Sequence, residues 1–411
     1  MAVTAPINRN FTLAILIFSS SVSVLSTDLY APSLASLPEY FGTSAEMVKL
    51  TMTLNLLAYA VCQLVYGPLS DRFGRRPVLV GGMLAFTAAG LACALSQTIE
   101  QLVLARVFQG IAGAAEAVLV YAIIRDLFDG RDRIRALAVF GIIFGAAPAV
   151  GPLLGGYIHV AFGWRANFFL LAVLAFISLL LILRFLPESA EPDHHAIKLR
   201  EIGRGYFGLL RDPLFMGYAI LMGTSVAAIF AFLTAGPFIL INNFGVATED
   251  FGLYYFFIVA SYMLGSLIIN RASHAVDPRV YLWLGVLVFL LGAGQVMWQV
   301  QSGAETPVSI TVGMCLIFFG IAPILAIGPA KALDATTNRV GFASALLGCT
   351  ELAVGGLGAA LVTVLHDATS MPLAITLVAV AVCAAYVLWL VGRREKQLHL
   401  ASCKAGGAPD P

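Results

Sequence analysis

The sequence predicts an all-α integral membrane protein whose twelve transmembrane helices form two pseudo-symmetric six-helix bundles. Composition is the first reason: 60% of the residues are hydrophobic and only 11% are charged, whereas soluble domains carry about 25% charged residues. The second reason is a series of long, continuous apolar runs. The third is one long polar stretch, residues 187–213, which separates these runs into two sets of six.

Each apolar run is long enough to cross a bilayer as a helix. An α-helix rises about 1.5 Å per residue, so about 20 residues cross the hydrocarbon layer of roughly 30 Å. Membrane β-strands are not expected, because they alternate apolar and polar residues. In chain order, the predicted spans are 11–35, 47–68, 78–97, 101–124, 136–159, 166–186, 213–241, 251–270, 280–299, 308–330, 341–364 and 372–391.

The central polar stretch sets the domain boundaries. We predict an N-terminal six-helix bundle at 1–190, a central linker at 191–212, a C-terminal six-helix bundle at 213–392 and a tail at 393–411. Within the stretch, residues 196–210 are either a plain connection or a basic amphipathic helix on the membrane surface. Two six-span halves around a central loop are typical of transporters whose site lies between the halves, near mid-membrane.

The basic residues predict the orientation of the chain. The sequence has 24 lysines and arginines. If both termini lie in the cytoplasm, Lys49 and Arg165 fall outside and Arg106 falls within a span, while the other 21 lie in cytoplasmic loops, tails or span ends. The positive-inside bias favours this orientation. The net charge of +1 provides no field that would attract nucleic acid.

No pattern in the sequence predicts an enzyme. All six histidines fall in loops or at span ends, and neither Gly-x-Ser-x-Gly nor His-Glu-x-x-His occurs. The six cysteines show neither paired nor metal-type spacing. We therefore expect no enzymatic activity, no metal and no cofactor.

Four ionisable residues are predicted to lie inside the membrane: Asp28, Arg106, Glu116 and Glu351. Such residues cost several kcal/mol in hydrocarbon, so they usually face a cavity or a partner. Asp28 lies about 25 Å from the inner boundary and Arg106 about 6 Å below the outer one. These depths are similar, so the two residues can form a salt bridge or a water-linked pair. The alternative for Asp28 is a hydrated position at the outer interface.

The fourth predicted span carries a polar stripe. Arg106, Gln109, Gly113 and Glu116 fall within an arc of about 80° on a helical wheel, so this face is not expected to look at lipid. Glu116 lies in the inner half of the membrane and Glu351 lies near its midplane. A carboxylate removed from water favours its neutral, protonated form. Both glutamates are therefore candidate proton carriers, or else permanently protonated groups hydrogen-bonded between helices.

The segment GPLSDRFGRRP, residues 67–77, follows the second span. It resembles the loop signature of the major facilitator superfamily, with matches at Gly67, Leu69, Asp71, Arg72, Gly74, Arg75 and Arg76. The resemblance implies the major facilitator fold and a conformational latch between the two halves. The counterpart after span eight, residues 265–279, has no matching acid, so the resemblance implies no second latch there.

Four further segments carry a narrower resemblance. TDLYAPSLASLP (27–38), LARVFQGIAGA (104–114), GWRANFF (163–169) and FLTAGPFIL (232–240) resemble drug:proton antiporters of the bicyclomycin/chloramphenicol-resistance type. The fifth span resembles the antiporter signature Gly-x-x-x-Gly-Pro-x-x-Gly-Gly, although Ala147 replaces its first glycine. The alternative is a packing helix, because proline and glycine let neighbours approach closely. The candidate antiporter-helix residues are Gly145, Pro148, Gly151, Pro152, Gly155 and Gly156.

The resemblance implies a proton-coupled transporter that exports drug-like small molecules across the cell inner membrane by alternating access. We expect Asp28 to be the main coupling site, with Arg106 adjusting its proton affinity and Glu116 or Glu351 contacting substrate or carrying a second proton. The nearest alternative is a proton-coupled amino acid or nucleobase transporter on the same fold. The expected partners are the lipid membrane, protons and a small molecule, and we expect a monomer. The candidate substrate-binding residues are Tyr30, Tyr59, Gln109, Tyr121, Phe230 and Phe232.

Overall fold

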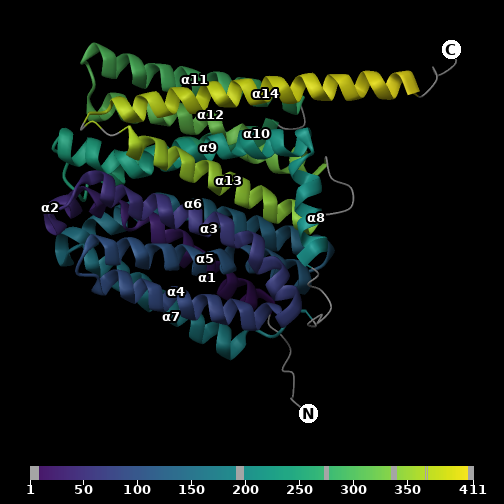
Figure 1. Ribbon diagram of the computed structural model, residues 1–411, viewed down its shortest axis with the longest axis horizontal. Helices are drawn as coiled ribbons and strands as arrows, with labels where there is room; N and C mark the ends of the chain where they lie inside the picture. The colour runs from purple at the N-terminus through teal and green to yellow at the C-terminus, as the bar shows by residue number, and fades with distance from the viewer. Residues whose placement is uncertain are drawn as a thin grey trace.

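The computed structural model describes residues 9–190, 199–272, 277–334, 340–365, 367 and 369–405, and in these residues it contains helices and no strands (Figure 1). The predicted all-α membrane fold is confirmed: eleven helices within the described ranges are long and apolar enough to cross a membrane. The remaining predicted span, 136–159, lies inside α6 (Gly130–Phe162). This helix is continuous over 33 residues and therefore contains the whole predicted span.

The first six spans begin and end at local sequence signals. Ser44 and Thr98 accept hydrogen bonds at 3.4 Å from the amides of Met47 and Gln101, so they cap the helices that follow them. Gly74 and Gly163 have φ of +95° and +81° and form one-residue turns between consecutive helices. The elements are α1 (Arg9–Asp28), η1 (Ala31–Ser36), α2 (Leu37–Phe41), α3 (Ala45–Phe73), α4 (Arg75–Leu95), α5 (Ile99–Leu127), α6 and α7 (Trp164–Phe185).

The C-terminal elements follow the same rules. Asp212 and Asp277 cap the helices that begin with Pro213 and Pro278, with amide-to-carboxylate distances between 2.8 and 3.1 Å. The elements are α8 (Leu199–Leu210), α9 (Pro213–Pro237), the π-helix η2 (Phe238–Asn243), α10 (Phe251–Ala272), α11 (Pro278–Ser302), α12 (Pro307–Asp334), α13 (Val340–Val364) and α14 (Met371–Ala405).

Helix α14 continues well past the predicted end of the last span at residue 391, because the next residues are good helix formers. Its extension is anchored. The Glu395 carboxylate accepts a hydrogen bond from the Tyr218 hydroxyl at 2.7 Å and pairs with the Arg279 guanidinium at 2.8 Å. Glu395 thereby joins α14 to α9 and α11, inside the segment that we predicted to be a tail.

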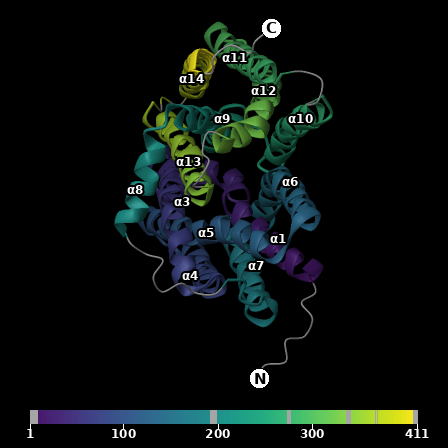
Figure 2. The ribbon, with the colours of Figure 1, turned by 90° about the vertical axis from the view of Figure 1, so that its right-hand side faces the viewer.

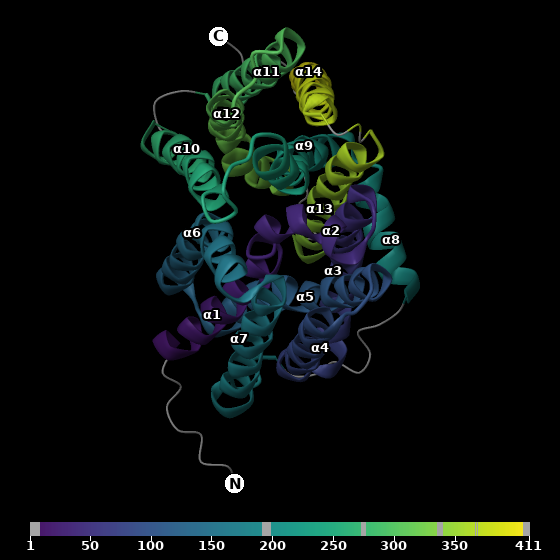
Figure 3. The same ribbon diagram turned by 90° about the vertical axis from the view of Figure 1, so that its left-hand side faces the viewer.

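The helices form two bundles, α1 to α7 and α9 to α14, seen end-on in Figures 2 and 3. Helix α3 packs against α13, and α6 packs against α10, across the boundary between the bundles. At one end of the molecule, which we call the η1 end, the Asn242 amide donates to the Ala35 carbonyl at 3.2 Å. At the same end, the Lys49 ammonium lies 5.0 Å from the centre of the Phe238 ring. The two bundles are therefore in direct contact at the η1 end.

The linker helix α8 crosses the opposite end of the molecule, the α8 end, roughly at right angles to the spans (Figure 1). The Tyr206 hydroxyl donates to the Leu64 carbonyl of α3 at 3.2 Å, and the centre of its ring lies 5.2 Å from the centre of the Phe342 ring of α13. Burial raises the pKa of Tyr206 to about 12, so the hydroxyl stays a donor at neutral pH. The segment is thus a helix over 199–210 that touches both bundles, while residues 196–198 of the predicted helix lie outside the described residues.

The glycines of α6 let two neighbours approach its backbone. A methyl group at Gly155 would collide with the Leu29 carbonyl, and one at Gly151 would lie 2.5 Å from the Asp28 Cβ. On another face, one at Gly156 would lie 2.7 Å from the Thr248 carbonyl of the C-terminal bundle. The predicted glycine pattern therefore packs α6 against α1 and against the second bundle. The surroundings of Gly145 lie outside what the structure describes.

Substituting Gly155 by alanine should destabilise the protein by about 1–3 kcal/mol, because the added methyl overpacks the α1–α6 contact. The matched control is Gly81→Ala, since nothing lies within 4 Å of the added methyl there. This control should be neutral or slightly stabilising. Thermal unfolding of the two purified variants in detergent gives the comparison, and equal melting temperatures would contradict the packing role of Gly155.

Candidate functional site

Asp28 is the last residue of α1, and it lies where the two bundles meet. Its side chain is 5% exposed and lies against Gly151 of α6. From the second bundle, Tyr255 of α10 lies within electrostatic range of its carboxylate. Within the described part of the chain, the carboxylate makes no hydrogen bond or ion pair. Asp28 is thus enclosed between α1, α6 and α10 and does not occupy the hydrated outer position considered as an alternative.

Arg106 is completely buried in α5, yet among the described residues it makes no ion pair with Asp28. Its guanidinium donates to the Ser26 carbonyl of α1 at 3.2 Å and to the Gln109 side chain at 2.6 Å. It also lies 5.3 Å from the centre of the Tyr30 ring. The direct salt bridge is therefore not formed, because Arg106 turns toward Tyr30 while Asp28 turns toward α6. Arg106 is instead connected to Asp28 through the backbone of α1, because its guanidinium donates to the carbonyl of Ser26 two residues before Asp28.

Glu116 is buried inside the N-terminal bundle at 2% exposure. The Ser19 hydroxyl of α1 donates to one of its carboxylate oxygens. Ser23 and Tyr59 lie beside it, and the second oxygen has no hydrogen-bond partner in the described residues. Glu116 is thus held by a hydroxyl-rich stretch of α1, on the same helix face as Arg106.

Glu351 projects from α13 of the second bundle and is only partly covered. Its carboxylate lies within electrostatic range of two phenols, Tyr121 of α5 and Tyr262 of α10. One helical turn earlier, Gly348 lies directly against the Gln63 side chain of α3. Glu351 therefore faces the N-terminal bundle, and the tyrosines around it come from both halves.

The predicted aromatic lining divides into buried and accessible residues. Tyr30 and Phe232 are 0% exposed. The hydroxyls of Tyr30 and Thr51 form a hydrogen bond of 3.1 Å, and the Phe232 ring stacks on the Tyr255 ring. Both are packing residues in this conformation. Gln109 is also buried in this conformation, where its side chain accepts the hydrogen bond from Arg106. Tyr59 and Phe230 are partly covered, and Tyr121 is 50% exposed.

The loop motif between α3 and α4 is tied by charge to its own bundle. Arg75 pairs with Asp71 at 2.7 Å and with Asp126 of α5 at 3.3 Å. Glu188, which follows α7, accepts a hydrogen bond from the Arg75 amide at 2.9 Å. Arg76 donates to the Leu183 carbonyl at 2.6 Å. These contacts join α3, α4, α5 and α7 at the α8 end.

Two members of this network, Asp126 and Glu188, were not among the residues selected from the sequence. The signal was present, because both directly follow predicted spans that end on the same side as the motif. The other motif residues contribute locally. Gly74 supplies the turn, Arg72 lies over the Phe73 ring at 5.2 Å, and Gly67 lies near Val118 of α5.

Comparison with known proteins decides the family. Residues 16–350 match the profile of the Major Facilitator Superfamily. The chain belongs to the major facilitator superfamily. The predicted fold and family are thereby confirmed.

Individual relatives of this major facilitator protein cover nearly the whole chain. It is 28% identical to a bicyclomycin resistance protein homolog of Haemophilus influenzae, over 92% of this chain and 95% of that one. It is also 28% identical to the multidrug transporter MdfA of Edwardsiella piscicida, over 85% of both chains. A solved bacterial homolog of the human lysosomal transporter Spinster superposes with a TM-score of 0.73 at 13% identity, over 95% of this chain and 98% of that one, and supports the fold.

Neutralising Asp126 should loosen the motif network. Asp126→Asn leaves the buried Arg75 with only the half-exposed Asp71 as an ionic partner, so we expect a loss of about 1–2 kcal/mol in stability. The control Asp129→Asn removes an exposed partner of Arg133 and should change stability by less than about 0.5 kcal/mol. Melting temperatures in detergent measure both. An Asp126 variant that melts like the Asp129 variant would rule out the network as a stabilising element.

Proposed function

We propose that this chain is a proton-coupled secondary transporter that exports drug-like small molecules across the cell inner membrane. Its relatives named for bicyclomycin resistance and multidrug transport support the substrate class. The observation that carries the coupling is the enclosed Asp28 carboxylate, which lies against the antiporter-motif glycine Gly151 where the two bundles meet. An acid in this position is exposed to different surroundings when the bundles move.

The α8 end is proposed to face the cytoplasm. Helix α1 begins and helix α14 ends at this end (Figure 1). The arginine-rich motif between α3 and α4 lies there as well, and basic residues favour the cytoplasmic side. The η1 end, where the bundles are in contact, then faces outward.

The exchange of protons for substrate follows from the free-energy cost of an ionised carboxylate in a site without water. When Asp28 loses its proton, either a proton or a positively charged or polar substrate group relieves that cost. If the two compete for the carboxylate, release of one accompanies binding of the other. Rocking of the bundles about the α6–α10 and α3–α13 contacts would expose the site to each side in turn.

Glu351 is proposed to contact the substrate. Its carboxylate lies within electrostatic range of Tyr121 and Tyr262, so a cation bound beside it would have one carboxylate and two aromatic rings nearby. Glu116 differs, because its hydrogen bond from Ser19 places it inside a single bundle. We assign it a second proton and no direct substrate contact.

The network around Arg75 is proposed to keep the N-terminal bundle rigid while it rocks. Its partners Asp71 and Asp126 lie in the same bundle, and so do the Glu188 contacts. In the conformation described here the motif therefore holds four helices of one half together. A latch role between the halves would require the motif to exchange partners when the α8 end closes.

The coupling role of Asp28 can be measured in proteoliposomes. Asp28→Asn should reduce proton-driven uphill transport to background, because an amide neither takes up nor releases a proton. Asp129→Asn is the matched control, since Asp129 is 85% exposed and lies outside the spans. Full uphill transport by the Asp28 variant would refute the coupling role. Uphill transport of amino acids or nucleobases in place of drugs would favour the metabolite transporter.

Glu351→Gln should weaken binding of a lipophilic cationic dye by about tenfold, which corresponds to roughly 1.4 kcal/mol. Binding of a neutral drug such as an amphenicol should change little, because the amide keeps the shape of the side chain. Fluorescence titration of the purified protein measures the dye, and competition against the dye measures the neutral drug. Equal losses for the two ligands would point to a packing defect and contradict the charge contact.

A further inference from the structure

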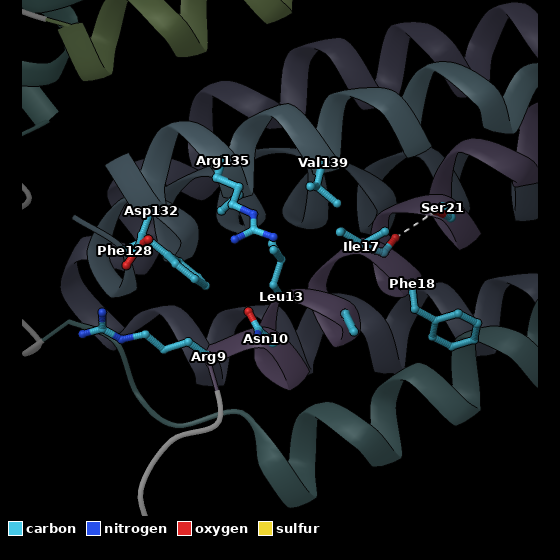
Figure 4. A pocket seen from close by; sticks show the side chains of 12 residues that line it. Arg9, Asn10, Leu13, Ile17, Phe18, Ser21, Phe128, Asp132, Arg135 and Val139 are labelled. Carbon is cyan, nitrogen blue, oxygen red and sulfur yellow. Dashed lines mark hydrogen bonds between the residues drawn. The ribbon is translucent and has the colours of Figure 1, made fainter. Parts of the chain in front are cut away.

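A groove of about 1020 Å³ lies between α1 and α6 at the α8 end (Figure 4). Figure 2 shows the first turns of α1 at the outer edge of the N-terminal bundle, away from the C-terminal helices. The groove therefore lies on the flank of one bundle, and it contains none of the residues assigned to transport.

The mouth of the groove carries an excess of positive charge. Arg9 of α1 and Arg135 of α6 flank it, with Asn10 between them and Asp132 one turn before Arg135. Both arginines are exposed, and neither forms an ion pair or hydrogen bond with another described residue. The neighbouring Arg133 differs, because it pairs with Asp129 at 3.3 Å and donates to the Phe128 carbonyl. Two arginines against one carboxylate favour an anionic ligand.

The wall below the mouth is apolar. Leu13, Ile17 and Phe18 line it from α1, and Val139 lines it from α6. At the inner limit, the Ser21 hydroxyl donates to the Ile17 carbonyl at 2.9 Å, so the one polar group there is already satisfied (Figure 4). From Arg9 to Ser21 the helix rises about 18 Å. That length is close to half of the roughly 30 Å hydrocarbon layer, which is one leaflet.

We propose that this groove binds an anionic phospholipid of the adjoining leaflet. Its phosphate would lie between Arg9 and Arg135, and one acyl chain would follow Leu13 and Ile17 down the wall. A soluble phosphate would not use the apolar wall, and a cationic drug would be repelled at the mouth. A zwitterionic lipid would use the wall but would gain less from the excess charge.

The position of the groove gives such a lipid a structural role. It would connect the starts of α1 and α6, the two helices that cross further along at Asp28 and Gly151. A bound lipid would therefore connect this helix pair at the end where the groove separates the two helices. The inference does not depend on which substrate is transported, nor on whether Asp28 carries the proton.

Native mass spectrometry of the full chain can test the proposal, with phosphatidylglycerol and phosphatidylcholine of equal chain length as probes. The wild type should retain phosphatidylglycerol preferentially, and the double variant Arg9→Gln/Arg135→Gln should reduce that retention by about tenfold. Arg184→Gln/Arg211→Gln removes the same charge elsewhere at the α8 end and should leave retention unchanged. Equal retention of the two lipids, or equal losses in the two double variants, would overturn the proposal.

A second variant tests the apolar wall independently of charge. Val139→Trp keeps both arginines but fills the groove, so it should lower phosphatidylglycerol retention while leaving the melting temperature measured without lipid unchanged. Binding of soluble glycerol phosphate as strong as that of the lipid would show a phosphate site only and contradict the proposal. Unchanged lipid retention in Val139→Trp would place the lipid elsewhere and equally overturn it.

Discussion

The contact between the end of α1 and the glycine-rich face of α6 is the constraint on which the arrangement of the site depends. Because Gly151 and Gly155 have no side chains, α1 can end directly on the backbone of α6, which leaves Asp28 enclosed at the boundary of the two bundles. On a third side, Gly156 brings the same helix against the C-terminal bundle. One helix, α6, thus determines the surroundings of the acid and also how closely the acid lies to the second bundle.

The ionisable residues within the spans have surroundings of different kinds. Arg106 has no acidic partner among the described residues, and a carbonyl, an amide and aromatic rings surround it. Glu116 is held by a serine hydroxyl, whereas Glu351 faces phenols from both bundles. These surroundings differ in how much they would change if the bundles separated. Those of Glu351 would change most, and those of Glu116 would change least.

Most of the fold could be predicted from the sequence, because hydropathy is a property of each segment by itself. The spans follow from local composition, which left the linker open between a plain connection and an amphipathic helix, and Asp28 open between an enclosed and a hydrated position. Which side chains contact one another does not follow from local composition. Depth along a helix placed Asp28 and Arg106 at the same level, but the direction of each side chain around its helix depends on packing, and it separates them. The same limit explains why the burial of Tyr30 and Phe232 in this conformation was not predicted, and why Asp126 was missed as a partner of Arg75.

The anchoring of Glu395 has a practical consequence for anyone who shortens the chain. A hydropathy plot suggests that everything after residue 392 is dispensable, since the last membrane crossing is complete there. A deletion at that point would remove the carboxylate that receives the Tyr218 hydroxyl and the Arg279 guanidinium. The contact that joins α9, α11 and α14 at this end of the molecule would then be lost. Purification tags are therefore better appended beyond Ala405 than substituted for the final turns.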